Sequence, residues 1–332
     1  MKLFYLLFSA SLYVLSYSPF DYKILIFFSL VIFFIVIEDL SLKNKIRYTF
    51  SYALLIHLLG VSWVSESLIT YGHISMIGSI LITASFIVIV SIPYILIAIF
   101  HKPIKKNGIY NINFIAVVFL AVEYIKSIFF GGFPWLLIGN SQNGTIFNYI
   151  YPFFGSYMVT YVLVIMASIF YKSICYKEKK YILLTIVLGL TYTSTYFHSF
   201  NKEGSFKEYI SYAIYQPNIY PDKAYDIDEY QDIVIQYSKF LDTKDSTDLT
   251  ILPETITPYI LDNNNKLLEK IKASANMNNV IVAGFFTKSE DNIFNSMVFF
   301  SDKVEYYHKR KLVPFGEYTP WYDTFIKLSG SL

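Results

Sequence analysis

Cysteine is nearly absent from this sequence, whose 332 residues include only Cys175. A single cysteine excludes an internal disulfide, and with it the small secreted scaffolds that disulfides hold together. The five histidines show no metal-ligand spacing, and the sequence contains no glycine-rich phosphate-binding loop. We therefore expect neither a metal nor an organic cofactor.

Charge is also scarce. Charged residues make up 16% of the chain, against about one quarter in an ordinary soluble domain, while hydrophobic residues make up 55%. Much of the chain is therefore expected to face lipid. The net charge of +2 is too small to indicate a nucleic-acid partner. Long apolar runs end near residue 197 and polar residues become frequent after it, which predicts a transmembrane helical domain at 1–200 and a polar domain at 201–332.

The first domain has enough apolar sequence for several membrane spans, each of which needs about 20 residues. The seven candidate runs are 3–16, 24–37, 50–64, 74–100, 112–130, 146–170 and 181–197. The first run, which follows Lys2, can also be interpreted as a signal peptide. It lacks a clear cleavage site and further runs follow, so the sequence favours an α-helical bundle of about seven spans.

The positions of Lys and Arg indicate the orientation of the bundle. The loops after the second, fourth and sixth runs hold Lys43, Lys45 and Arg47, then Lys102, Lys105 and Lys106, then Lys172, Lys177, Lys179 and Lys180. The alternate loops hold only Lys23 and Lys126. This pattern predicts a cytoplasmic N-terminus and, after seven spans, a polar domain outside, in the periplasm of a two-membrane bacterium. Cys175 then lies on the cytoplasmic side and is not a nucleophile for that domain.

Two features of the apolar half are not explained by membrane spanning alone. Glu123 lies in an apolar run, where an ionisable group is costly and often functional. Lys126 lies one helical turn away, so a structural ion pair and a substrate-binding role both remain open. The segment 131–142 interrupts the helix with glycines and a proline. It either dips back into the bilayer surface or forms an outer loop anchored by Trp135.

The polar half alternates strand and helix patterns. Strands are predicted at 212–215, 248–252 and 280–286, a hairpin at 294–300 and 304–307, and helices at 226–241 and 261–276. In the second helix, Leu267, Leu268 and Ile271 recur at helical spacing and are expected to face inward. This order indicates a layered α/β domain. The last dozen residues add no element that closes the sheet, so we expect the domain to be incomplete at its C-terminus.

Two polar residues occupy positions suited to catalysis. Glu254 directly follows a predicted strand, and catalytic groups gather at the carboxyl ends of strands in α/β sheets. At the edge of an apolar core its pKa would be raised, which suits a general base; a solvated turn residue is the alternative. Lys309 follows the predicted hairpin, where it either stabilises an oxyanion or belongs to a basic surface turn.

Three motifs of the polar half occur together: Leu-Pro-Glu at 252–254 after a strand, Lys309 after a hairpin, and Leu-Val-Pro-Phe-Gly-Glu at 312–317. Together they resemble the carbon–nitrogen hydrolase (nitrilase) superfamily. The preceding apolar runs and the Gly-Phe-Pro-Trp-Leu…Gly-x-Ser-Gln segment at 132–142 narrow the resemblance to the apolipoprotein N-acyltransferases. The resemblance covers essentially the whole chain and implies a nitrilase-like αββα sandwich after the helical bundle.

The resemblance also implies site residues. Glu254 matches the general base of the family, Lys309 its oxyanion-stabilising lysine, and Glu317 a second glutamate that supports the site. The candidate substrate-binding residues are Tyr225, Asn295, Trp135 and Glu123.

In such an enzyme the glutamate deprotonates a cysteine, which takes an acyl chain from a membrane phospholipid. The acyl group then passes to the N-terminal amine of the diacylglyceryl-cysteine of an apolipoprotein. The resemblance thus implies an acyltransferase of lipoprotein biosynthesis in the bacterial inner (cytoplasmic) membrane, with phospholipid, apolipoprotein and membrane lipid as partners.

The cysteine of the family and its closing membrane span have no counterpart before Leu332. We therefore expect a C-terminally truncated chain, whether a fragment, a split gene product or an inactive protein, and no turnover by this chain alone. Two alternatives remain: a membrane-tethered amidase or nitrilase, and an inactive remnant that binds lipoproteins or lipids.

Overall fold

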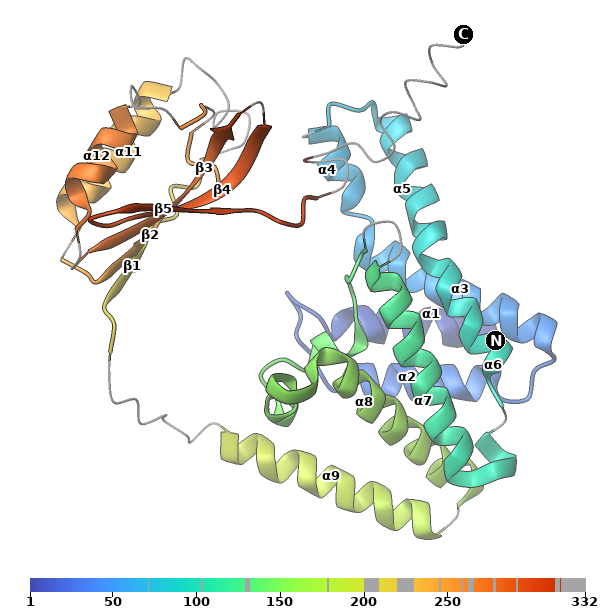
Figure 1. Cartoon of the computed structure of the whole chain (residues 1–332). Helices are drawn as coiled ribbons and strands as arrows, with labels where there is room; N and C mark the ends of the chain where they lie inside the picture. The colour runs from blue at the N-terminus through green and yellow to red at the C-terminus, as the bar shows by residue number, and fades with distance from the viewer. Residues whose placement is uncertain are drawn as a thin grey trace. The chain divides into compact units, whose positions relative to one another are not determined.

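The computed structural model divides the chain into two compact units, Met1–Glu203 and Gly204–Leu332 (Figure 1). It describes residues 1–70, 72–102, 104–128, 132–177, 179–199, 209–219, 230–244, 246–257, 259–261, 266–276, 279–290, 292–313 and 317. The sequence-based boundary after residue 200 differs from this division by three residues.

The regular secondary structure described in the first unit is entirely helical (Figure 1). Its helices are α1 (Lys2–Leu15), α2 (Leu25–Ile37), α3 (Leu42–Val61), α4 (Val64–Thr70), α5 (Met76–Ser91), α6 (Ile95–Phe100), α7 (Ile104–Ile128), α8 (Tyr151–Tyr176) and α9 (Lys179–Ser199), with the 3-10 turns η1 (Ile92–Tyr94), η3 (Ile138–Gln142) and η4 (Ile146–Tyr149). Aromatic side chains fill the interior, where Phe33 and Tyr52 stack with ring centroids 4.5 Å apart.

Three of the described helical stretches, Met76–Phe100, Asn111–Ile128 and Tyr151–Tyr176, are long and apolar enough to cross a membrane. A fourth is added if α3 and α4, bent by 44° at their junction, form one span. Each of the other predicted runs contains a shorter apolar helix. The 14 residues of α1, for example, rise only about 21 Å against a hydrocarbon core of about 30 Å. The described residues therefore establish three or four spans by length and composition, fewer than the predicted seven.

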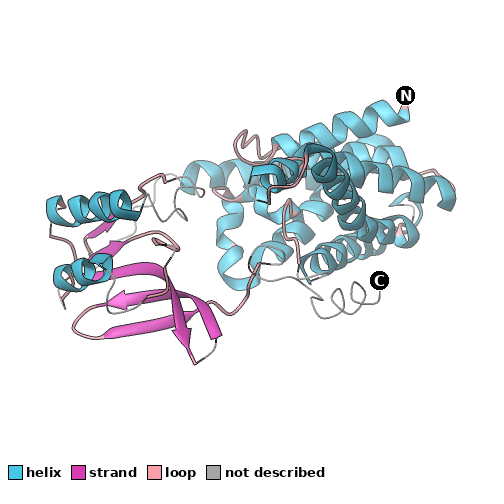
Figure 2. Ribbon diagram, turned by 90° about the horizontal axis from the view of Figure 1, so that it is seen from above, coloured by secondary structure: helices cyan, strands magenta, loops and turns pink. Residues whose placement is uncertain are grey.

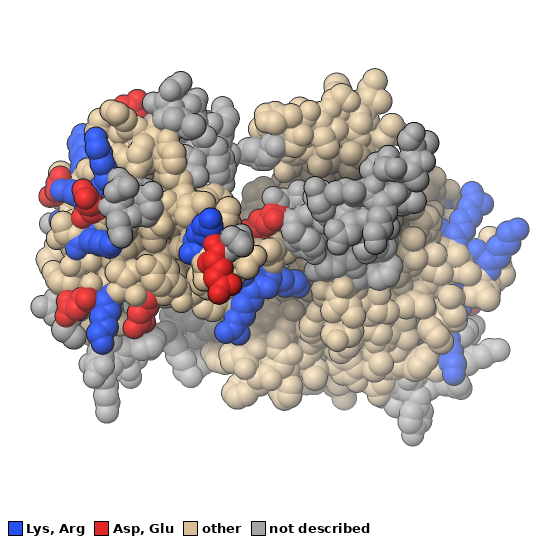
Figure 3. Space-filling model, turned by 45° about the horizontal axis from the view of Figure 1, so that its top comes forward, with Lys and Arg blue, Asp and Glu red and all other residues tan. Residues whose placement is uncertain are grey.

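The surface of the helical unit agrees with its composition. Figure 3 shows Lys, Arg, Asp and Glu interspersed over the α/β unit, whereas broad areas over the helices carry no charged side chain. Exposed side chains on the helices include large apolar ones such as Ile77, Leu81 and Phe153. Such a surface is suited to lipid contact rather than to water.

The interrupted segment between α7 and α8 is tied to the bundle through its carbonyl groups. After α7 ends at Ile128, φ is positive at Gly132 (+88°) and at Leu136 (+55°), so the backbone at these two residues is not α-helical. Three tyrosine hydroxyls donate to carbonyls of the segment: Tyr13 to Leu136 (2.8 Å), Tyr17 to Leu137 (2.8 Å) and Tyr151 to Gly139 (2.5 Å). Irregular backbone is tolerated among membrane helices where protein groups satisfy it, as they do here.

The second unit is a mixed five-stranded sheet with two helices (Figures 1 and 2). Its elements are β1 (Tyr212–Ile214), α11 (Tyr230–Thr243), β2 (Leu249–Ile251), α12 (Lys266–Ser274), β3 (Val280–Ser289), β4 (Asn292–Phe300) and β5 (Val304–His308). The strand order is β1-β2-β3-β4-β5, parallel among the first three strands and antiparallel from β3 to β5. The predicted alternation of strand and helix is confirmed, while residues 226–229 of the first predicted helix lie outside the described residues.

The two faces of this sheet differ in burial. The helices α11 and α12 pack on one face, where Tyr237 and Leu267 meet Ile281 and Phe285 in a closed core. Side chains on the opposite face include Tyr212, Ile214, Met297 and Tyr307, and all of them are exposed. The described residues of this unit therefore form one helical layer and one sheet whose second face is apolar and open.

Gly139 provides a test of the interrupted segment. A Cβ at this position would lie 2.0 Å from the carbonyl oxygen of Ser156, which is a backbone atom of α8. We expect Gly139→Ala to destabilise the protein by about 1–3 kcal/mol. The thermal unfolding midpoint in detergent would measure this.

The matched control is Gly189→Ala, because nothing lies within 4 Å of a Cβ at Gly189 in α9. Alanine favours a helix over glycine, so this variant should unfold at the same temperature as the parent protein or slightly above it. Equal midpoints for the two variants would contradict the packing described here.

Candidate active site

Glu254 lies in a turn that remains hydrogen-bonded to the sheet after β2 ends. The Leu252 amide donates to the Val282 carbonyl (2.8 Å). Beyond it, the Gly284 amide donates to Pro253 (2.9 Å), and the Ile256 amide donates to Gly284 (3.0 Å). The backbone around Glu254 is therefore fixed by β3, which favours a functional position over an ordinary solvated turn.

Gly284 makes this close approach possible. A Cβ at Gly284 would lie 2.5 Å from the amide nitrogen of Thr255 and 2.6 Å from Cα of Glu254. Only glycine lets the β3 backbone and the turn come so near. The sequence analysis missed this residue, although a glycine inside an otherwise bulky strand is a recognisable signal of close backbone approach.

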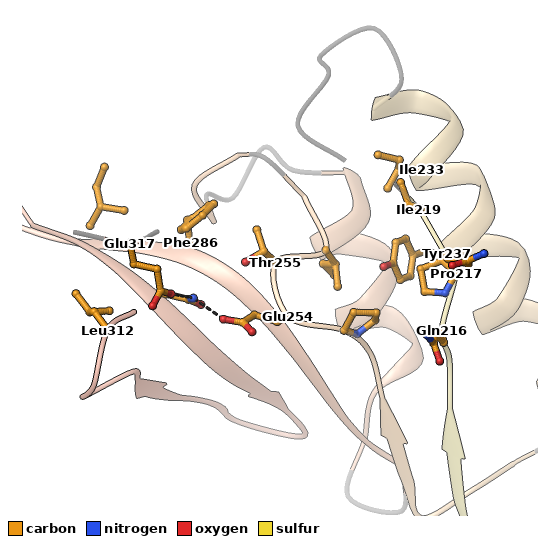
Figure 4. A pocket seen from close by; sticks show the side chains of 15 residues that line it. Gln216, Pro217, Ile219, Ile233, Tyr237, Glu254, Thr255, Phe286, Leu312 and Glu317 are labelled. Atoms are coloured by element: carbon orange, nitrogen blue, oxygen red, sulfur yellow. Dashed lines mark hydrogen bonds between the residues drawn. The ribbon is translucent and has the colours of Figure 1, made fainter. Parts of the chain in front are cut away.

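Four predicted residues meet at the end of β5. Lys309 Nζ lies 3.2 Å from Glu254 Oε1 and 2.9 Å from Glu317 Oε1. Asn295 Nδ2 donates to the same two oxygens, at 2.6 Å and 2.7 Å. The Lys309 amide also donates to the Asn295 carbonyl (2.8 Å), which fixes the start of the lysine side chain. Figure 4 shows the carboxylates of Glu254 and Glu317 directed toward one another.

Contacts within the cluster shift the pKa values of Lys309 and Glu317. The hydrogen bond to Glu317 raises the pKa of Lys309, and Glu254 adds to this effect against the opposing effect of partial burial. Partial burial pushes the pKa of Glu317 upward, but hydrogen bonds from Lys309, the Val313 amide and Asn295 together hold it below its usual range. Lys309 is therefore a persistent cation, and Glu317 is a persistent anion that holds it in place.

From the sequence, Glu254 is expected at the edge of an apolar core, with a solvated turn residue as the alternative. The Glu254 side chain is 64% exposed. The physical reason is that described elements pack on only one face of the sheet, so no apolar layer lies over this carboxylate.

A cavity of about 740 Å³ adjoins the cluster (Figure 4). Glu254, Asn295 and Glu317 contribute its polar wall. Ile233 and Tyr237 from α11 and Phe286 from β3 contribute apolar wall. The cavity can therefore hold an apolar group next to a carboxylate and an ammonium.

Glu123 is in the helical unit, and its contacts are internal. The side chain is buried, with 2% exposure. Its Oε1 accepts from the Ile138 amide (2.5 Å) and its Oε2 from the Thr160 hydroxyl (2.5 Å). No ion pair within 4.0 Å joins Glu123 to Lys126, and Lys126 Nζ instead donates to the Leu136 carbonyl (3.5 Å). Both oxygens of Glu123 thus fasten the interrupted segment to α7 and α8. Thr160, which the sequence analysis missed, also accepts from the Gly139 amide (2.8 Å).

Trp135 and Cys175 both belong to the helical unit. Trp135 is 49% exposed and packs against Phe133 and Trp63, with ring centroids 6.0 Å and 5.4 Å apart. Cys175 is exposed near the end of α8 in the helical unit. Tyr225 lies outside the described residues.

His308 is the last residue of β5 and precedes Lys309. Its ring stacks on Phe294, with centroids 4.4 Å apart, and its Nδ1 lies 2.7 Å from the Ser296 hydroxyl. Ser296 in turn lies 2.6 Å from Thr287 Oγ1. These contacts support the carboxyl end of β5 from the side of the sheet that faces away from Lys309.

The shifted pKa of Glu317 predicts a pH dependence. A carboxyl whose pKa is lowered on folding contributes stability above its ordinary value, 4.5 for Glu317, and loses that contribution as the pH falls through the folded value. Lys309, whose pKa is raised, contributes fully below 10.5 and loses its contribution as the pH rises through the folded value. The cluster should therefore be intact between these limits.

The Val313 amide donates to Glu317 Oε2 (2.7 Å) and can report on the acid limit. In protein labelled with 15N-valine, its resonance should stay constant near neutral pH and shift only below pH 4.5. The variant Glu317→Gln should abolish that acid shift. An acid shift that persists unchanged in the variant would contradict the assignment.

The chain is similar to known proteins over most of its length. The family model for the apolipoprotein N-acyltransferase N-terminal domain matches residues 9–169. Among curated proteins, the apolipoprotein N-acyltransferase of Haemophilus ducreyi is 24% identical over 324 residues, covering 92% of this chain and 63% of that protein. The apolipoprotein N-acyltransferase of Pasteurella multocida is 25% identical over 354 residues, covering 99% of this chain and 66% of that protein. That of Aquifex aeolicus is 29% identical, covering 89% and 67%.

The chain spans about two thirds of the length of these relatives. The matches include both the helical unit and the unit that carries the Glu254 cluster. The chain is therefore similar to the apolipoprotein N-acyltransferases over most of its length, and residues 9–169 match the N-terminal domain of that family.

Proposed function

We propose that the protein transfers a fatty acyl chain from a membrane phospholipid to the N-terminal amine of the diacylglyceryl-cysteine of an apolipoprotein. The observation that carries this proposal is the convergence of Glu254, Lys309, Glu317 and Asn295 within hydrogen-bond distance of one another. A base beside a fixed cation is the arrangement that acyl transfer through a thiol requires.

Glu254 is the general base in this proposal. Its Oε1 is occupied by Lys309 and Asn295, whereas its Oε2 makes no hydrogen bond with any described residue. Oε2 is therefore the oxygen that takes the proton from a cysteine thiol. The thiolate attacks the ester carbonyl of the phospholipid, and the lysophospholipid leaves with a proton, which gives an acyl thioester.

Lys309 stabilises the oxyanion of each tetrahedral intermediate, because its ammonium is already held beside the base by Glu317. In the second half of the reaction, the α-amine of the lipoprotein attacks the thioester, and an amide forms as the thiol is regenerated. Tyr225 and Trp135 are proposed to contact acyl chains. Glu123 acts on substrate binding through the segment that carries Trp135, since both of its oxygens are engaged within the protein.

In the proposed orientation Cys175 lies near the cytoplasmic end of α8, so the thiol does not come from it. We assign it to polypeptide additional to these 332 residues. The exposed apolar face of the sheet, with Tyr212, Ile214 and Met297, supports this assignment. It is suited to pack against the second sheet of a nitrilase-like αββα sandwich, and Asn295 lies on the same face of β4 as Met297.

The proposed location is the bacterial inner membrane, with the N-terminus cytoplasmic and the α/β unit in the periplasm. The apolar helices and the alternation of basic loops support a multi-pass protein with this orientation. A site next to the bilayer suits the reaction, because the donor and the acceptor are both lipids.

A transfer assay with labelled phospholipid and a diacylglyceryl peptide tests the proposal. In the complete gene product, Glu254→Gln and Lys309→Met should each lower the rate by about 10²-fold or more. Lys303→Met, an exposed lysine near the same strand, is the matched control and should leave the rate unchanged. Full activity of Glu254→Gln would favour an inactive lipid-binding remnant, and release of acyl groups only from soluble amides would favour an amidase.

The 332-residue chain by itself should form no acyl thioester with labelled phospholipid. Intact-protein mass spectrometry before and after hydroxylamine treatment would detect one, because hydroxylamine cleaves thioesters. A hydroxylamine-sensitive acyl adduct on this chain would show that the assignment of the nucleophile is wrong.

A further inference from the structure

The helical unit contains a second cavity that the proposed reaction does not use. Its volume is about 220 Å³, and it lies among α2, the turns η3 and η4, α8 and α9. Nearly all of its lining is apolar: Ile26, Phe27, Phe28, Leu163, Met166, Phe170 and Leu188. It shares no residue with the Glu254 cluster.

The surroundings of this cavity indicate what it can hold. Water in an apolar cavity lacks the two to four polar partners that it needs. The outward side of α9 carries Leu183, Ile186 and Leu190, all more than half exposed, as expected for a helix that faces lipid tails. A narrow apolar cavity beside such a surface is suited to a hydrocarbon chain.

One cation stands at the rim of the cavity. The Lys23 carbonyl accepts from Gln142 Nε2 (2.8 Å), and Gln142 is itself 2% exposed, so the lysine backbone is anchored by a buried side chain. Lys23 Nζ donates to the Asn143 carbonyl. A Cβ at Gly144 would lie 3.0 Å from Nζ, so the glycine leaves room for the ammonium.

An ammonium has three N–H donors, and the bond to Asn143 uses one of them. Two donors and the positive charge therefore remain to meet an anion at the rim. The expected orientation of the spans does not account for this charge, because Lys23 belongs to the alternate loops, which hold only Lys23 and Lys126.

We propose that this cavity binds a membrane glycerophospholipid, with one acyl chain between α2, α8 and α9 and the phosphate on Lys23. The two halves of such a lipid match the two parts of the site: an apolar cavity and a fixed cation at its rim. The bound lipid fills the space between α9 and the rest of the bundle, and so it fixes the last described helix before the α/β unit.

The test uses the 332-residue chain in phosphatidylglycerol and phosphatidylethanolamine nanodiscs that contain a phospholipid with a diazirine in its acyl chain. After irradiation, labelled peptides are mapped by mass spectrometry. We expect labels on cavity residues such as Met166 and Leu188 in several-fold excess over the outward Leu183 and Ile186. Equal labelling of the two sets would mean ordinary boundary lipid and would overturn the proposal.

Two variants make the test specific. Gly189→Leu places a side chain in open space at the cavity, since nothing lies within 4 Å of a Cβ there, and should suppress the cavity labels. Its matched control is Ile186→Leu on the outward side of α9, which should leave them unchanged. Cavity labels that survive Gly189→Leu would count against the site.

Lys23→Gln tests the phosphate contact without changing the cavity. Loss of one lysine from a lipid headgroup site should lower retention of the lipid by about fivefold. Lys43→Gln, an exposed lysine away from the cavity, is the control. Unchanged retention in Lys23→Gln would overturn the headgroup assignment. These readouts measure lipid binding rather than turnover, so they test this proposal independently of the proposed acyl transfer.

Discussion

The candidate site depends on one ammonium group shared by two carboxylates. Glu254 and Glu317 would repel each other at this separation, and Lys309 with the Asn295 amide offsets that repulsion. The partners come from the turn after β2, from β4, from the end of β5 and from the segment that follows it. The cluster therefore joins parts of the chain that are up to about 60 residues apart in sequence. The hydrogen bond from the Lys309 amide to the Asn295 carbonyl fixes its geometry.

The helical unit also contains a carboxylate that needs partners, and there a backbone amide and a hydroxyl take the place of the ammonium. Glu123 accepts hydrogen bonds from the Ile138 amide and from the Thr160 hydroxyl, so one group of the interrupted segment and one group of α8 compensate a costly buried carboxylate. That segment can leave the helical path among apolar helices because side chains replace the lost backbone hydrogen bonds. From the sequence pattern alone, Glu123 resembles a substrate-binding group. Its contacts show instead that it holds in place the segment that carries Trp135.

The sequence predicted the order of elements well, because periodicity reports burial directly. Leu267, Leu268 and Ile271 recur at helical spacing and lie in the core of the α/β unit as expected. The members of the cluster were predicted from motifs that resemble a known family. Local sequence patterns alone do not indicate that Glu254 and Lys309 lie close together. The sequence analysis did not identify Gly284, whose importance arises from the turn across the sheet, and it left the exposure of Glu254 open, because that exposure depends on the second face of the sheet.

The open face connects the two unresolved requirements of the proposed mechanism. A base works best where water is excluded, yet Glu254 is 64% exposed, and the reaction needs a thiol that the α/β unit does not contain among these residues. A second sheet packed on Tyr212, Ile214 and Met297 would meet both requirements at once. It would bury apolar surface, bring a nucleophile to the carboxyl end of β2, and cover the carboxylate that activates it. Folding of the sandwich and assembly of the active site would then be the same event.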